Sequence, residues 1–524
     1  VLSSGFATAL LESPEIVDEN GSFSTKKSPP SAKVDKKMSS SRLWGRFKKV
    51  KSQIFDTSIL EENCKKTKAK CLDPYNISGF RESTLIKRED YVMHELSQLI
   101  KSDMKPALGV TEPGAIAFAV AKARCYTNGE IVKINVAMNS GMYKNAFTCG
   151  IPNSKEVGNV FSAALGGVAG NAEKGLEALA DVTEADNEAA HKLVDAGKVS
   201  VVLSGITSCI FIEATVMTER DAAVVTIRDS HTNITKITVN GKVILKTEDE
   251  KKADTSEAEK TAEDASLIHK YTLQQLYEYI TTVDIEEISF IRDAYKVNLE
   301  LFHEGLKNPR TTFARHLLEI NGGKEISENE KATASLLCNA AIEARVIGLD
   351  KPAMSITGSG AHGIIATMPL YAAYKVNGYT EAQLLRATAL SYLICMYIKE
   401  YSGRLSAFCG CAIAAGSGMA CALIYLRGGT VEMMAHTLNN MASSITGMIC
   451  DGGNQGCTMK GIAAVDAAYA SVDFAMKGAY IFDVHGINGK TPEETMRNMG
   501  LIAAPGMTGT EKTIVEILKN KLKQ

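Results

Sequence analysis

The sequence is poor in tryptophan and in net charge, and its cysteines lack the dense spacing of a disulfide scaffold. It has one Trp among 524 residues and a formal net charge of −2, with 58 Lys and Arg against 60 Asp and Glu. This balance argues against a protein that reads nucleic acid through one large basic face. An apolar fraction of 45% with 23% charged residues excludes a chain disordered throughout, and the composition is not that of collagen.

The twelve cysteines stand at long and irregular intervals, unlike those of a small secreted domain. This spacing predicts a reducing, intracellular compartment, and we expect a cytoplasmic protein. In such a compartment a local group of cysteines is more often a metal or redox site than a disulfide.

Residues 1–88 differ in composition from the rest of the chain and predict a disordered basic arm. The stretch 26–51 holds ten basic residues and one acid, and subtracting its +9 from −2 leaves −11 for the remainder. Leu43, Phe47 and Val50 fall at helical spacing among lysines, so targeting to an organelle or a membrane surface stays open.

The spacing of hydrophobic residues divides the rest of the chain and predicts an α+β protein, a large mainly helical domain with an inserted smaller α/β domain. The expected divisions are residues 89–128 plus 268–524 for the helical domain, 129–247 for the α/β domain and 248–267 for an exposed charged linker. Asn240-Gly241 between apolar alternations predicts a two-residue hairpin. Ser327-x-x-Glu330 and Thr380 predict the starts of two helices.

Residues 405–426 form a run of 22 uncharged residues, as long as a membrane span, for which ~20 apolar residues suffice. The run contains several Gly and Ser residues, and no second run of equal quality accompanies it. A helix buried in a large domain gives the same pattern. We therefore expect no transmembrane span, with a span as the alternative.

Two glycine-rich loops directly precede apolar helices. In the loop 109–114, Thr111 suits a helix cap and Glu112 would lie at the positive end of the helix. The loop 358–363 could hold a substrate carboxylate on free backbone N–H groups, with His362 as an acid or base or as an ordinary loop histidine.

Two pairs of cysteines lie close in sequence: Cys409 with Cys411, and Cys450 with Cys457. Thiolates without nearby histidines favour zinc or an iron–sulfur cluster, and the spacing is not that of a zinc ribbon. A [4Fe–4S] cluster held by three cysteines keeps one iron open as a Lewis acid. Buried structural cysteines are the alternative interpretation.

Several motifs in order resemble the L-cysteine desulfidase family, related to iron–sulfur L-serine dehydratase alpha chains. These motifs are residues 106–113, 143–146, 231–234, 358–363 and 450–457. The resemblance implies a [4Fe–4S] lyase that removes the β-substituent from a small L-amino acid. L-Cysteine would give pyruvate, ammonia and hydrogen sulfide, and L-serine would give pyruvate and ammonia. The expected partner is this substrate, with no nucleic acid, and a homo-oligomer stays open.

The resemblance also implies residue roles. Glu112 and His362 are the expected catalytic residues, and Cys409, Cys450 and Cys457 the expected metal ligands, with Cys411 as the alternative to Cys409. The expected substrate-binding residues are Thr111, Asn145, Ser359 and Gly360.

The chain departs from the family pattern at position 110, where the usual Cys-Thr-Glu-Pro motif begins with Val110. Valine cannot move a proton, so Glu112 or His362 does this work, or the substrate differs, or activity is lost. A catalytically silent homologue that binds an amino acid is therefore a rival interpretation. A pyridoxal phosphate enzyme with Lys460 as its Schiff base is a third.

Overall fold

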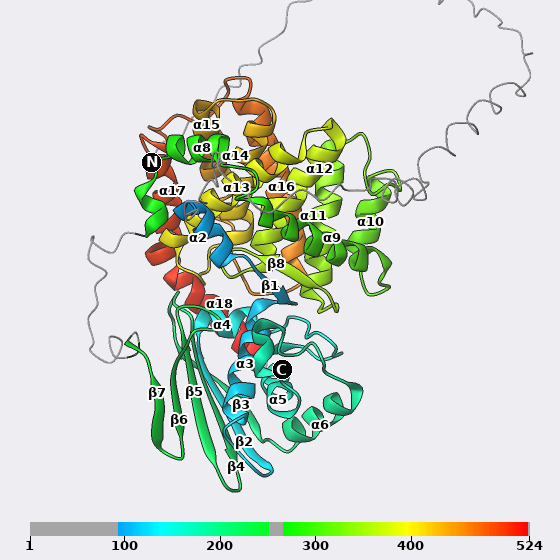
Figure 1. The fold of residues 1–524 in the computed structure, drawn as a ribbon, viewed down its shortest axis with the longest axis vertical. Helices are drawn as coiled ribbons and strands as arrows, with labels where there is room; N and C mark the ends of the chain where they lie inside the picture. Colours follow the sequence, from blue (N-terminus) through cyan, green and yellow to red (C-terminus); the bar gives the residue numbers. More distant parts are fainter. Residues whose placement is uncertain (1–92, 249, 251–265, 522–524) are drawn as a thin grey trace, which may run out of the picture. The chain divides into compact units, whose positions relative to one another are not determined.

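The computed structural model describes residues 93–248, 250 and 266–521, and all of them belong to one compact unit, Asp90–Gln524. Helices form one part of this unit and a sheet covered by helices forms the other (Figure 1). The α+β class predicted from the sequence is confirmed. The basic arm, and all of the predicted linker except its two ends and Glu250, lie outside the described residues. The predicted division into domains stays a prediction.

The helical part is built around α13 and α14, most of whose residues are buried. Gly418 of α14 lies so close to α13 that a Cβ there would stand 2.2 Å from the Ser391 carbonyl oxygen. Small residues thus let these helices approach closely. The helices of this part are α2 (Glu95–Asp103), α8 (Leu273–Thr282), α9 (Arg292–Lys307), α10 (Phe313–Ile320), α11 (Glu330–Val346), α12 (Gly360–Asn377), α13 (Glu381–Ser402), α14 (Gly416–Leu426), α15 (Val431–Ile445), α16 (Gly456–Ala475) and α17 (Pro492–Leu501).

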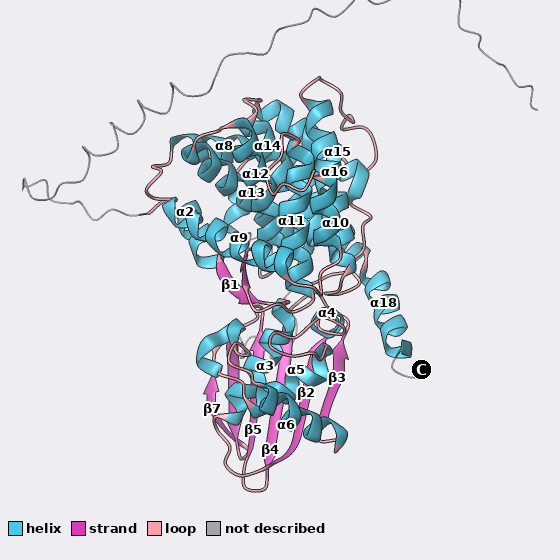
Figure 2. Cartoon of the chain, turned by 90° about the vertical axis from the view of Figure 1, so that its right-hand side faces the viewer, coloured by secondary structure: helices cyan, strands magenta, loops and turns pink. Residues whose placement is uncertain are grey.

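The sheet of the α/β part has the strand order β3-β2-β4-β5-β6-β7, in which β2 and β3 run parallel and the other neighbours antiparallel. The helices α3, α5 and α6 lie on one face of it (Figure 2). The strands are β2 (Ile131–Asn139), β3 (Val199–Gly205), β4 (Phe211–Thr218), β5 (Ala222–Arg228), β6 (Ile234–Val239) and β7 (Lys242–Lys246), and the helices are α3 (Thr111–Arg124), α4 (Ser140–Asn145), α5 (Gly158–Val168) and α6 (Glu184–Asp195).

Two features connect the helical and α/β parts. The strand β1 (Lys105–Leu108), which leads into α3, pairs antiparallel with β8 (Pro352–Ser355), which leads into α12. The last helix, α18 (Thr508–Lys521), packs against α4. Both glycine-rich loops therefore follow strands of one small two-stranded sheet.

The local sequence signals have mixed outcomes. The hairpin at Asn240-Gly241 is confirmed, with both residues at positive φ between β6 and β7. Thr380 caps α13 in a capping box, as predicted. The predicted Ser327 cap is wrong, because the side chain of Asn329 accepts the hydrogen bond at the start of α11. Thr111 does not cap α3 either, since it is already the first helical residue.

The uncharged run 405–426 is not one helix. Residues 405–410 lead into a π-helical turn, Cys411–Ala415, and α14 follows. The side chains from Ala412 to Ile424 are buried, which agrees with the buried-helix interpretation. Among the described residues, no helix is both long enough and apolar enough to cross a membrane.

Candidate active site

Glu112 lies in the first turn of α3, where its carboxylate is 5% exposed. Asn145 Nδ2 donates to Glu112 Oε1 at 2.9 Å, and His231 Nε2 stands 3.7 Å from the same oxygen. Burial by itself would raise the pKa of Glu112, but His231, Asn145 and Arg345 outweigh it and lower that pKa. The carboxylate is therefore ionised at neutral pH.

Asn145 ends α4 and connects Glu112 to the cysteine loop 450–457. Its Oδ1 accepts a hydrogen bond from Cys450 Sγ at 3.8 Å, and its backbone carbonyl accepts from Gly453 N at 3.1 Å. Because the amide contacts both Glu112 and Cys450, the structure brings these two predicted site residues to one place.

Val110, the departure from the family motif, is buried directly before α3 and faces the same loop. A Cβ at Gly453 would lie 2.8 Å from Val110 Cγ1. A cysteine at position 110 would thus point its thiol toward the cysteine loop.

The loop 358–363 ends in α12, whose N-cap is Ser359 and whose first residue is Gly360. The first backbone N–H groups of a helix have no intrahelical partner, so this end can receive a carboxylate. Gly358 has φ +77° and lies against His231, where a Cβ would stand 3.2 Å from the imidazole. A cavity of about 50 Å³ is lined by His231, Gly358 and Arg404, among others.

His362 is 5% exposed and held from both sides. The hydroxyl of Thr357 donates to the Ile356 carbonyl, so it accepts from Nδ1 of His362. The other nitrogen, Nε2, faces Gly410, where a Cβ would lie 2.7 Å away. Burial and the charge of Lys399 hold the pKa of His362 well below its usual value, so the imidazole is neutral with its lone pair toward the segment Cys409 to Cys411.

The four predicted cysteines come from two chain segments that the backbone holds side by side. Cys409 N donates to the Met448 carbonyl at 3.0 Å, and Cys450 N donates to the Ala407 carbonyl at 2.6 Å. Cys457 lies in the first turn of α16. Electrostatic coupling joins all four thiols, and a hydrogen bond from Cys411 lowers the pKa of Cys409 to about 7.

Three lysines lie beside these thiols. Lys144 is fully buried and donates to the carbonyl of Cys450 at 2.9 Å, while Lys460 pairs with Asp451. Lys399 is 3% exposed and its stem packs on Gly410. Burial lowers the pKa of Lys399 to about 8.

Comparison with known protein families gives an independent result. Residues 173–516 match the family model described as the serine dehydratase alpha chain. The chain belongs to this family. A protein named UPF0597 from Clostridium botulinum (strain Langeland) is 39% identical over 80% of this chain and 97% of its own length. Relatives with the same name from Caldanaerobacter subterraneus and Clostridioides difficile are 36% and 33% identical, each over 81% of this chain and at least 98% of their own lengths.

The relationship to iron–sulfur serine dehydratase alpha chains, expected from the ordered motifs, is thereby confirmed. Membership of the serine dehydratase alpha chain family supports a lyase-type enzyme, and this family generally depends on an iron–sulfur group. The names of the relatives give no substrate.

A serine dehydratase alpha chain needs ligands for its iron–sulfur group, and the cysteines are chemically suited to bind such a group. Within the described residues no three His, Cys, Asp or Glu side chains stand in a metal-binding arrangement. The donors gathered here are nevertheless thiols, the ligands that iron–sulfur clusters use. Lys144 and Lys460 would offset the negative charge of thiolates bound to iron.

Three polar residues near this site are not among the site residues predicted from the motifs. Arg345 of α11 is 4% exposed, donates to Thr111 Oγ1 at 3.4 Å, and has no partner at Nε in the described structure. Lys399 and His231 are the others. Arg345 and Lys399 each stand close to an acidic residue in helical sequence that is otherwise largely apolar, and the sequence alone does not mark them as site residues.

Proposed function

We propose that the protein is an iron–sulfur-dependent lyase that eliminates the β-substituent from L-cysteine or L-serine. The observation that carries this proposal is the convergence at Asn145, which contacts the ionised Glu112 on one side and Cys450 on the other. Family membership supports the same reaction class.

The cluster would be held by Cys409, Cys450 and Cys457, with Cys411 as the alternative to Cys409. When bound there, a [4Fe–4S] group supplies a Lewis-acidic iron that activates the leaving sulfide or hydroxide.

The remaining roles belong to residues of this chain. Arg345 and the start of α12 at Gly360 hold the substrate carboxylate, because the unpartnered Nε of Arg345 faces Gly360. The carboxylate of Glu112 and the amide of Asn145 hold the ammonium group. Neutral His362 accepts the α-proton at Nε2.

The decisive experiment is anaerobic purification followed by iron and sulfide analysis and by pyruvate assays with L-cysteine and L-serine. We expect about four irons per chain, as in a [4Fe–4S] cluster. Cys450→Ser should lose both iron and activity, whereas the matched control Cys125→Ser, at an exposed cysteine, should keep both. A folded wild-type chain without iron would rule out the cluster.

A second candidate function follows from Val110: a catalytically silent homologue that binds an amino acid. Cysteine is smaller than valine, so Val110→Cys fits the buried site against Gly453 without overpacking. Pyruvate release that appears only in the Val110→Cys variant would favour the silent homologue. Release by the wild type would favour the lyase.

A further inference from the structure

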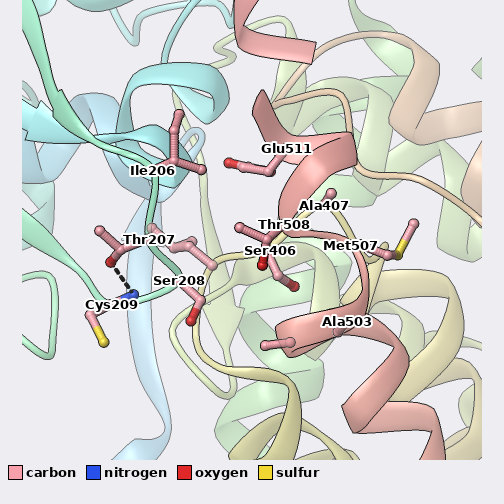
Figure 3. Close-up of a pocket in the computed structure, with 12 residues that line it drawn as sticks. Ile206, Thr207, Ser208, Cys209, Ser406, Ala407, Ala503, Met507, Thr508 and Glu511 are labelled. Atoms are coloured by element: carbon pink, nitrogen blue, oxygen red, sulfur yellow. Dashed lines mark hydrogen bonds between the residues drawn. The ribbon is translucent and has the colours of Figure 1, made fainter. Parts of the chain in front are cut away.

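A second cavity, of about 220 Å³, lies away from Glu112 and His362. It is formed where the turn between β3 and β4 meets the segment 405–407 and the start of α18 (Figure 3). Its walls combine small apolar side chains with hydroxyl groups. The lining residues used below are Thr207, Ser208, Ser406, Ala504, Thr508 and Glu511.

Glu511 lines this cavity and carries an unused acceptor, the buried oxygen Oε1. Its residue is 5% exposed, and its carboxyl end extends toward Ile206 on the opposite wall (Figure 3). Oε2 accepts from Lys144 Nζ at 2.8 Å, but the buried Oε1 has no hydrogen-bond partner in the described part of the chain.

Lys144 cannot satisfy that second oxygen. Its ammonium group has three protons, which already go to the carbonyl of Ser406, the carbonyl of Cys450 and Oε2 of Glu511. The hydroxyl of Ser406, in the same wall, is also buried and without a partner among the described residues. A buried acceptor left unpaired costs free energy, so a donor from outside the chain is favoured at this position.

The lining defines the chemistry of that donor. No Lys or Arg is among the described residues that line the cavity, and Lys144, which pairs with Glu511, already uses its three protons, so an anionic ligand would find no free charged donor there. A carboxylate oxygen calls for an N–H donor, strongest when the donor is charged. The hydroxyls of Thr207, Ser208 and Thr508 offer further acceptors, and Ala504 belongs to a wall that suits a short apolar group.

We propose that this cavity binds a small primary ammonium ion, R–NH3⁺, which donates a hydrogen bond to Oε1 of Glu511. R is either hydrogen or a short alkyl group. The inference does not depend on the lyase chemistry proposed above, because none of the proposed catalytic residues or cluster ligands lines the cavity.

Isothermal titration calorimetry on the full-length protein tests it, with ammonium chloride and n-propylammonium chloride as separate probes. Tetramethylammonium chloride, which has the charge but no N–H group, is the ligand control. Glu511→Gln removes the acceptor charge. Ala504→Leu fills the cavity and leaves the pair of Glu511 with Lys144 intact. Glu516→Gln removes an exposed carboxylate from the same helix and is the matched protein control.

We expect at least one primary ammonium probe to bind with a Kd in about the millimolar range, as suits so small a ligand. Glu511→Gln and Ala504→Leu should each weaken binding at least about tenfold, a difference of about 1.4 kcal/mol, and Glu516→Gln should not. Which probe binds identifies R. The proposal is overturned if neither probe binds the wild type, if tetramethylammonium binds equally well, or if Ala504→Leu, folded by circular dichroism, binds like the wild type.

Discussion

At the scale of single residues, the site depends on buried charges whose state is set by their neighbours. Glu112 is surrounded by protein, yet His231, Asn145 and Arg345 keep it ionised. His362 is neutral because burial and nearby Lys399 disfavour its charged form. On the surface, the same residue types would keep pKa values close to their usual ones, since solvent would screen these interactions.

Replacing Glu112 by Gln should change how stability depends on pH. The folded-state pKa of Glu112 lies below its usual 4.5, so its ionisation contributes stability that is present above about pH 4.5 and is lost as pH falls through the folded pKa. The free energy of unfolding of the wild type should therefore fall more steeply in acid than that of Glu112→Gln. Urea unfolding at a series of pH values measures both. Glu130→Gln, at an exposed position, should follow the wild type, and equal slopes for all three would mean that Glu112 is not held ionised.

Replacing Arg345 by Met should raise the KM for the amino-acid substrate about 10- to 100-fold, since a hydrogen bond to a charged group is worth about 1.5–3 kcal/mol. The physical reason is the loss of the guanidinium that faces both Thr111 and Gly360. Steady-state pyruvate assays give KM and kcat separately. The exposed Arg220→Met is the matched control. A fall in kcat with no change in KM would contradict a role in substrate binding.

At the scale of elements, the positions of the site residues depend more on how closely the helices approach one another than on the hydrophobicity of any one helix. The π-helical turn Cys411–Ala415 precedes α14, so the thiols of Cys409 and Cys411 lie where the regular helix has not yet begun. Glycine at position 410 leaves room for His362 and Lys399 on the same side. The amino-acid composition does not show which pairs of helices meet.

Gly418→Ala should destabilise the contact between α13 and α14. The added Cβ would stand 2.2 Å from the carbonyl oxygen of Ser391, and such overpacking typically costs about 1–3 kcal/mol. We expect a melting temperature several degrees lower by circular dichroism. The matched control is Gly447→Ala, whose Cβ would meet nothing within 4 Å and which should melt at or slightly above the wild-type temperature. Equal melting of both variants would mean that the helices can separate at no cost.

At the scale of the whole described unit, a buried ion pair and the other hydrogen bonds of its lysine join four distant parts of the chain. Lys144 belongs to α4, its partner Glu511 to α18, and its remaining hydrogen bonds go to the segment before α14 and to the cysteine loop. The position of the cysteine loop is therefore linked to the C-terminal helix.

Lys144→Met should cost about 3–5 kcal/mol of unfolding free energy, because it leaves the carboxylate of Glu511 buried and unpaired. The double variant Lys144→Met/Glu511→Leu should recover part of this loss, since neither charge then stays buried. Urea unfolding of the two single variants and the double variant measures the coupling. Lys155→Met, which breaks an exposed pair with Glu184, should change little. Additive losses at positions 144 and 511 would contradict the coupling.

The sequence by itself determined the class of the fold, the hairpin at Asn240-Gly241, the start of α13 and the family. These follow from local backbone preferences and from ordered motifs, which are properties of neighbouring residues. The positions of Thr111 and Ser327 were misjudged as caps because any of several nearby polar residues can end a helix, and packing selects among them.

Only the tertiary structure decided which residues meet. The contact of Asn145 with Glu112 and Cys450, the position of Val110 against Gly453, and the unpartnered oxygen of Glu511 each join segments far apart in the chain. The charge states of Glu112, His362 and Lys399 likewise could not be predicted from the sequence. Each depends on burial and on charges brought near by folding, and a sequence pattern records neither quantity.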